Sequence, residues 1–160
     1  MSNILLRDIL ISARQESVQM RHHYIGVEHL FIALLTIQGG LASGILETQG
    51  LTADYVIDAI RRKMDKGTPQ RLWAGIPYTP RAEIILDIAN DMALDNGTED
   101  ITERELLNAI IIENDSLPIR VLKALNLNLA ALEEHSRTYV PTKEPHLPNL
   151  NITFSSDFDR

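Results

Sequence analysis

The fold is organised around Tyr24-Ile25-Gly26-Val27-Glu28-His29-Leu30, because a related sequence, Asp100-Ile101-Thr102-Glu103-Arg104-Glu105-Leu106, follows it at a constant offset. Ile25 and Ile101 lie 76 positions apart, and so do Leu30 and Leu106. Identical apolar residues at one offset indicate one structural unit used twice. The other identical pairs, found without a gap from Ile9 to Leu51, are Ile9 and Ile85, Leu10 and Leu86, Ala13 and Ala89, Ala33 and Ala109, Leu41 and Leu117, Leu46 and Leu122, and Leu51 and Leu127.

Each copy of the unit is predicted to contain four helices, because apolar residues recur at helical spacing between glycine and proline breaks. The second helix is apolar on nearly every side, so we expect it to be buried. Thr52, Thr79 and Thr102 are predicted N-caps, and Glu105 completes a capping box with Thr102. Gly26 is predicted to let the backbone turn tightly. The expected helices span about residues 5–20, 27–37, 41–48, 52–64, 79–94, 102–111, 116–125 and 128–137.

The predicted fold class is all-α: a pseudo-twofold eight-helix bundle made of two four-helix repeats, followed by a non-helical, proline-rich C-terminal tail. The expected domain covers residues 1–138, with repeat one at about 3–66, a linker at 67–78 and repeat two at about 79–137. In the tail, residues 139–160, three prolines within eight residues exclude a helix. Ile152 and Phe154 alternate with polar residues, which is compatible with a short strand.

The bulk composition excludes several classes of partner. The net charge is −7, so the chain repels phosphate backbones and we expect no nucleic-acid partner. The 160 residues include no cysteine, which excludes disulfides, thiol catalysis and thiolate zinc sites. No apolar run has the length of a membrane span, and the first residues lack the features of a signal peptide. We therefore expect a cytoplasmic protein without a membrane partner.

The sequence carries no catalytic or cofactor motif. It has no phosphate-binding loop, no dinucleotide-binding glycine fingerprint and no G-x-S-x-G nucleophile elbow. We therefore expect no catalytic residue, no cofactor and no enzyme activity in this segment. The basic residues near the end of the fourth expected helix are interleaved with aspartates, which predicts a solvated helix end. They are Arg61, Arg62, Lys63 and Lys66.

The histidines and the glutamate of the first stretch are candidates for binding. His22, His23 and His29 lie near Glu28, and both residue types bind zinc. The H-E-x-x-H spacing is missing, so we expect no metal and a hydrogen bond from His29 to a neighbouring backbone group. Glu28 lies in the first turn of a helix, where its carboxylate either caps the helix or helps to hold a ligand that carries both charges. The equivalent residue of the second copy is Arg104, so the two sites differ in charge.

These motifs resemble those of a known family, the Clp N-terminal (Clp repeat) domain, which precedes the AAA+ rings of Hsp100 unfoldases such as ClpA, ClpC and ClpB. The resemblance rests on residues 23–30, on Ala33-Leu34-Leu35, and on Tyr78-Thr79-Pro80-Arg81-Ala82 at the opening of the second copy. It spans roughly residues 3–137 and includes both repeats in order. It implies a pseudo-symmetric eight-helix bundle that docks adaptor proteins and receives unfolded or marked substrates for the ATPase ring.

The resemblance also implies site residues. In ClpC-like members, carboxylates in two Gly-x-Glu-His motifs bind phosphoarginine, a degradation mark, and Glu28 matches the first of these positions. In the second motif Arg104 replaces the glutamate; its guanidinium would repel an arginine side chain and attract a phosphate. The residues predicted to contact a protein or ligand are Gly26, Val27, Glu28, Thr102, Glu103 and Arg104.

Two functions stay open on the sequence alone. The first is the substrate- or adaptor-docking domain of a Clp/Hsp100-type ATPase or protease regulator. The second is a stand-alone Clp-repeat accessory protein that modulates a Clp protease complex without ATPase activity. The expected partner is an adaptor or a substrate protein, and in the second case a Clp ring or protease. The tail does not resemble the usual run into a first ATPase domain, and it would serve the accessory protein as a docking arm.

Overall fold

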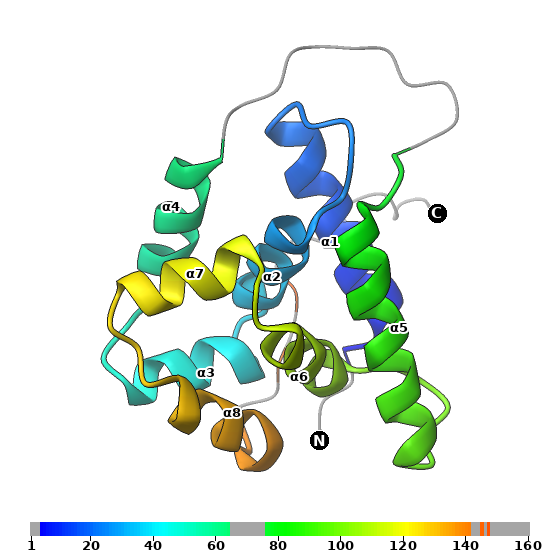
Figure 1. Ribbon diagram of the computed structural model, residues 1–160, viewed down its shortest axis with the longest axis vertical. Helices are drawn as coiled ribbons and strands as arrows, with labels where there is room; N and C mark the ends of the chain where they lie inside the picture. The colour runs from blue at the N-terminus through cyan, green and yellow to red at the C-terminus, as the bar shows by residue number, and fades with distance from the viewer. Residues whose placement is uncertain (1–3, 65–75, 142–144, 146, 148–160) are drawn as a thin grey trace, which may run out of the picture.

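The structure, a computed structural model, describes residues 4–64, 76–141, 145 and 147. These parts contain eight α-helices and no strand, which confirms the predicted all-α class (Figure 1). The strand expected near Ile152, and most of the expected linker and tail, lie outside the described residues. The helices are α1 (Leu6–Gln19), α2 (Val27–Thr36), α3 (Leu41–Thr48), α4 (Ala53–Lys63), α5 (Pro80–Asp95), α6 (Glu103–Glu113), α7 (Leu117–Ala124) and α8 (Leu129–Thr138).

The structural repeat with an offset of 76 residues covers a longer part of the chain than the identical residues indicated. Shifting the bounds of α3 by 76 gives the bounds of α7, and the shifted start of α4 is the start of α8. Left-handed backbone recurs at the same offset: φ is 81° at Gly50 and 63° at Asn126, and 61° at Arg21 and 74° at Gly97. The first and third helices of the two copies therefore end in the same way, even where glycine is replaced by another residue.

The helix starts follow the predicted capping chemistry. The hydroxyl of Thr52 accepts a hydrogen bond from Tyr55 N–H at 3.2 Å, and that of Thr79 accepts one from Ala82 N–H at 3.1 Å. Pro80 occupies the first position of α5, where its missing N–H costs nothing. None of the helices in the described ranges combines the length and the apolar character that a membrane span requires.

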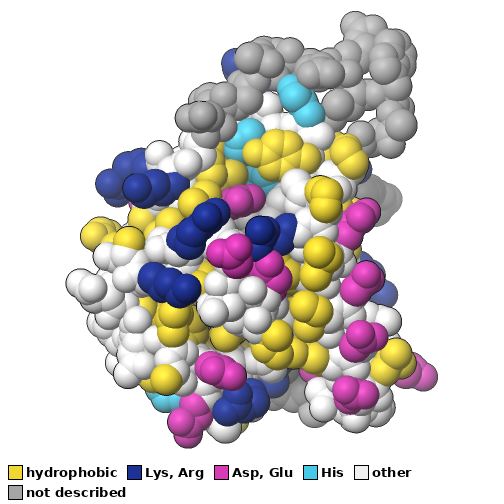
Figure 2. Space-filling model, in the orientation of Figure 1, with side chains coloured by type: hydrophobic (Ala, Val, Ile, Leu, Met, Phe, Trp, Pro, Cys, Tyr) yellow, Lys and Arg dark blue, Asp and Glu magenta, His cyan; other side chains and the backbone are white. Residues whose placement is uncertain are grey.

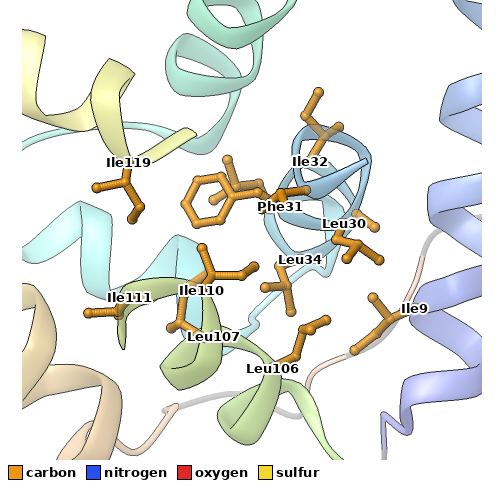
Figure 3. Close-up of a cluster of buried hydrophobic side chains, with 14 of the residues drawn as sticks. Ile9, Leu30, Phe31, Ile32, Leu34, Leu106, Leu107, Ile110, Ile111 and Ile119 are labelled. Carbon is orange, nitrogen blue, oxygen red and sulfur yellow. The ribbon is translucent and has the colours of Figure 1, made fainter. Parts of the chain in front are cut away.

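Helix α2 lies in the middle of the bundle (Figure 1). It packs against α1, α3, α4, α5, α6 and α7, and all its residues from His29 to Leu35 are buried. Figure 3 shows its Phe31 and Leu34 beside the apolar side chains of α6. A helix that is apolar on all sides must be covered on all sides. The prediction that this helix is buried is confirmed.

Backbone hydrogen bonds join the two repeats reciprocally. Leu6 N–H donates to Ile101 O at 2.8 Å, and Thr79 N–H donates to Ile25 O at 3.0 Å. In both cases the start of one repeat's first helix binds the residue before the N-cap of the other repeat's second helix. The two motif turns are therefore each held by the opposite repeat.

The prediction that Gly26 uses the backbone freedom of glycine is wrong. Its φ is −104° and its ψ is −179°, an extended conformation open to any residue. The left-handed residue at this corner is Arg21 instead. What Gly26 provides is space, because a Cβ there would lie 2.6 Å from Oε1 of Glu28. A side chain at this position would displace the Glu28 carboxylate from the helix start.

Candidate functional site

The two motif turns use the same hydrogen bond with different side chains. At the start of α2, Gly26 N–H donates to Nδ1 of His29 at 2.8 Å. At the start of α6, Thr102 N–H donates to Oε1 of Glu105 at 2.7 Å, as the predicted capping box requires. His29 and Glu105 are 76 positions apart, so an imidazole in one repeat does what a carboxylate does in the other. The expected hydrogen bond between His29 and a neighbouring backbone group is confirmed.

The imidazole of His29 is neutral. It is 0% exposed, and Nε2 lies 2.7 Å from Nδ1 of His22. Because Nδ1 of His29 accepts from Gly26, the ring proton lies on Nε2 and is donated to His22. Burial, followed by the proximity of His22, lowers the pKa of His29 from 6.5 to about 4, while the carboxylate of Glu16 acts in the opposite direction.

An aromatic cluster covers this histidine pair. The ring of Tyr24 stacks on His22, with ring centroids 5.2 Å apart, and meets His29 edge-on at 5.4 Å. Ser17 fixes the turn by donating to the carbonyl of Tyr24 at 2.7 Å. Tyr24 as a residue is 38% exposed, so it forms the outer side of the cluster. Among the described residues, no three histidine or carboxylate side chains are grouped as a metal site would require.

A partly buried ion pair ties α1 to α4 beside the histidine pair. Arg61 donates to both carboxylate oxygens of Glu16, at 2.9 and 2.8 Å. The hydrogen bond with Glu16 is the main reason why the pKa of Arg61 is raised above its ordinary value. Arg62 pairs with Asp58 at 3.3 Å on the exposed side. Arg61 therefore belongs to the packing of α4 and not to a free basic surface.

The first motif presents one available charged group, Glu28. Its carboxylate lies over Gly26 in the first turn of α2, and the residue is half-buried. Within the described ranges no hydrogen bond or ion pair engages this carboxylate. Val27, its neighbour, is 2% exposed and belongs to the core, so it does not line a surface. Of the three residues predicted here, Glu28 is the one with a charged group and partial exposure, and Gly26 provides the space beneath it.

The charged residues of the second motif, unlike Glu28, form hydrogen bonds within the chain. Arg104 donates to the carbonyls of Ser136, at 2.8 Å, and Tyr139, at 2.5 Å. These carbonyls lie at the end of α8, where a cation is favourable. Glu103 is 2% exposed, and its Oε1 accepts from Leu41 N–H, at the start of α3, at 2.8 Å. The second motif therefore has a positive charge where the first has the carboxylate of Glu28. The guanidinium of Arg104 binds backbone carbonyls of this chain.

A pocket of about 320 Å³ brings the second set of predicted residues together. Thr102, Glu103 and Arg104 line it, and Glu28 does not. The residues that sequence reasoning missed are Leu41, Glu105, Val140 and Pro141. Their proximity depends on how the segment after α8 packs, which no local pattern encodes. One signal was present, because Glu103 occupies the position of an apolar valine in the first copy.

The surface of α5 is acidic. Figure 2 shows acidic side chains along this helix, and the exposed residues Glu83, Asp87 and Asp91 recur every fourth position. The counterparts in α1 are Arg7, Ile11 and Gln15. This charge is therefore a property of the second copy and not a requirement of the fold.

Comparison with known proteins places the chain among proteins with the same repeats. Residues 5–125 and 77–160 match the family model of the Clp repeat (R) N-terminal domain. The chain is 30% identical over 147 residues to the ATP-dependent Clp protease ATP-binding subunit ClpC of Staphylococcus aureus, with 92% of this chain and 18% of that protein covered. It is 29% identical over 143 residues to ClpC of Staphylococcus saprophyticus, covering 89% and 17%. The chain thus spans less than a fifth of the length of these relatives.

Solved structures share the fold. The Hsp104 N-terminal domain of Candida albicans superposes with a TM-score of 0.70 at 12% identity, covering 90% of this chain and 95% of that one. The ClpD N-terminal domain of Arabidopsis thaliana gives 0.64 at 18% identity, covering 82% and 89%. At these identities the likeness concerns the arrangement of the helices alone.

Proposed function

Because the chain belongs to the family of Clp repeat N-terminal domains, we propose that it is a protein-docking module of a Clp/Hsp100-type unfoldase or protease regulator. It would bind adaptor proteins, or unfolded or marked substrates, for an ATPase ring. The relatives that carry this segment are ATP-binding subunits of which it is a minor part, and this favours the docking module over a stand-alone accessory protein.

The proposal rests on the partial burial of Glu28 and on the lack of a partner for its carboxylate among the described residues. A half-buried carboxylate without a partner in the described residues stands at a helix start, beside the half-exposed ring of Tyr24. A charged group next to an apolar surface is the arrangement that protein recognition uses for orientation and contact area. The turn is held by Thr79 of the other repeat and by His29, so the group is presented on a rigid support.

The module acts by binding in this proposal, and it needs no catalytic residue or cofactor. Several charged groups of the described residues serve the fold itself, such as Glu105 in a helix cap and Arg61 in an ion pair with Glu16. A Clp ring or protease is the associated machine. The net charge of −7 disfavours nucleic acid as a partner.

Recognition of a phosphoarginine mark, where it occurs, would rest on the first motif. Glu28 has the charge and the availability to receive a guanidinium. Arg104 already donates to the carbonyls of Ser136 and Tyr139 at the end of α8, and its positive charge would repel a guanidinium.

The test compares the wild-type chain with a Glu28→Ala variant in binding to a fluorescently labelled, chemically unfolded model protein. The matched control is Asp87→Asn, an exposed carboxylate removed from α5. We expect Glu28→Ala to weaken binding at an unchanged melting temperature, and Asp87→Asn to bind as wild type. Equal binding by Glu28→Ala would show that the site is wrongly assigned. Absence of binding by the wild type, to folded and unfolded proteins alike, would overturn the docking function.

A further inference from the structure

We infer that the pocket formed by α3, α6, Val140 and Pro141 binds an unmodified basic side chain, lysine or arginine, of a protein ligand. The inference rests on the proposed docking function and names the chemistry recognised by one of its surfaces. The pocket lies in the second repeat and does not include Glu28.

The first observation is a buried carboxylate oxygen without a donor. Glu103 lines the pocket, and its Oε1 is bonded to Leu41 N–H. Its Oε2 is also buried, and no donor in the described part of the chain reaches it. A buried carboxylate is strongly disfavoured unless its oxygens receive hydrogen bonds. Glu103 already lines the pocket, so a small rotation of its carboxylate would bring Oε2 to the pocket surface, where an N–H group of a ligand would supply the missing donor.

The second observation is that the fold does not require this carboxylate. The counterpart of Glu103 in the first copy is Val27, which is also 2% exposed. The same position is therefore buried equally well with an apolar side chain in the first copy, and the charge of Glu103 is particular to the second copy.

The charges around the pocket select a cation. Glu105 is a second carboxylate in its wall and is 7% exposed. The one basic wall residue, Arg104, is neutralised in part by the carbonyls at the end of α8. The starts of α3 and α6 would favour an anion, but Glu103 and Glu105 already occupy their N–H groups. A phosphate would therefore meet two carboxylates, whereas an ammonium or guanidinium group would pair with them.

The remaining walls fit the stem of a long basic side chain. Leu41, Val140 and Pro141 are apolar and line the same pocket. Lysine and arginine bury their methylene groups on apolar surface while the charged end reaches polar partners. A volume of about 320 Å³ is small for a ligand pocket and suits one side chain.

The experiment is an NMR titration of the chain with the capped peptides acetyl-Gly-Lys-Gly-amide and acetyl-Gly-Arg-Gly-amide, with norleucine in the central position as the uncharged control. We expect the backbone amide signals of Leu41, Glu103 and Val140 to shift with the basic peptides and not with norleucine. In Glu103→Gln the amide oxygen still accepts from Leu41, while an NH₂ group replaces Oε2. This variant should bind about tenfold more weakly or worse, the effect of one charge-assisted hydrogen bond.

Two further variants keep the result interpretable. Asp87→Asn makes the same change in net charge on the exposed face of α5 and should bind as wild type. Val140→Trp should close the pocket without altering either carboxylate, and a 69% exposed valine tolerates the change. Unchanged affinity in Glu103→Gln, shifts confined to other residues, or tighter binding of inorganic phosphate at these amides would overturn the inference.

Failure here is distinguishable from failure of the docking function. Loss of unfolded-protein binding in Glu28→Ala together with no peptide binding would refute only the pocket. Peptide binding as described, in a chain that binds no protein, would refute the docking function.

Discussion

We expect acid to destabilise the native state through His29, and we expect His29→Gln to remove most of this effect. The buried ring accepts from Gly26 N–H through Nδ1, so a proton on Nδ1 would set two donors against each other. Glutamine is the matched replacement, because Glu105 shows that a side-chain oxygen at this position receives the same N–H. Its NH₂ group can still donate to His22.

The size of the effect follows from the pKa of His29, which is about 4 in the native state against 6.5 in the unfolded chain. Since the unfolded state binds the proton more readily, the contribution of His29 to the free energy of unfolding is fully present above pH 6.5. This contribution is lost as the pH falls towards 4. At about 1.4 kcal/mol per pKa unit, this linkage contributes about 3 kcal/mol in full. Between pH 7 and pH 4.5 it amounts to about 2 kcal/mol, or about 6 °C in melting temperature for a domain of this size.

The assay is urea unfolding of wild type and His29→Gln at pH 7, 6, 5 and 4.5. Carboxylates titrate in the same range in both proteins, so the quantity of interest is the difference between the two free energies of unfolding. We expect the wild type to lose about 2 kcal/mol relative to the variant over this range. A difference that stays constant with pH would refute the assignment of a neutral, proton-excluding imidazole.

Three further changes test the packing around the two motifs. Gly44→Ala should destabilise the domain by about 1 kcal/mol although alanine favours a helix, because its Cβ would lie 2.6 to 2.8 Å from the ring of Tyr139; a higher melting temperature would show that the ring is not fixed there. Thr102→Ala should cost about 1 kcal/mol in urea unfolding through loss of the capping box, and an unchanged midpoint would disprove the cap. Arg61→Met should cost about 1 kcal/mol by leaving Glu16 buried without its partner, and adding Glu16→Gln should recover part of it; no recovery in the double variant would speak against the pair.

The helices could be predicted because capping residues and apolar spacing are short-range sequence signals. The repeat could be predicted because equivalent residues lie at one constant offset. The caps Thr52, Thr79 and Thr102 formed as expected, and the observed helix bounds lie close to the predicted ones. The offset of 76 positions required only that equivalent residues be compared. Even the left-handed ends at Gly50 and Asn126 agree with it.

The charges of the candidate site residues could be predicted from the sequence, but the partners that their side chains bind could not. The difference between Glu28 and Arg104 is visible in the sequence, yet the partners of Arg104 are backbone carbonyls, which carry no sequence signature. The packing of Val140 and Pro141 beside α6 depends on the path of the chain after α8. Comparing Glu103 with Val27 would have revealed a carboxylate at a core position, and this comparison is the one signal that the sequence offered.

Hydrogen exchange of the chain, with and without an unfolded model protein, tests most directly whether ligands dock at the starts of α2 and α6. We expect added protection of the backbone around residues 26–29 and 102–105, and we expect the protection of residues 26–29 to be smaller in Glu28→Ala. Protection confined to other surfaces, or identical in the variant, would contradict it.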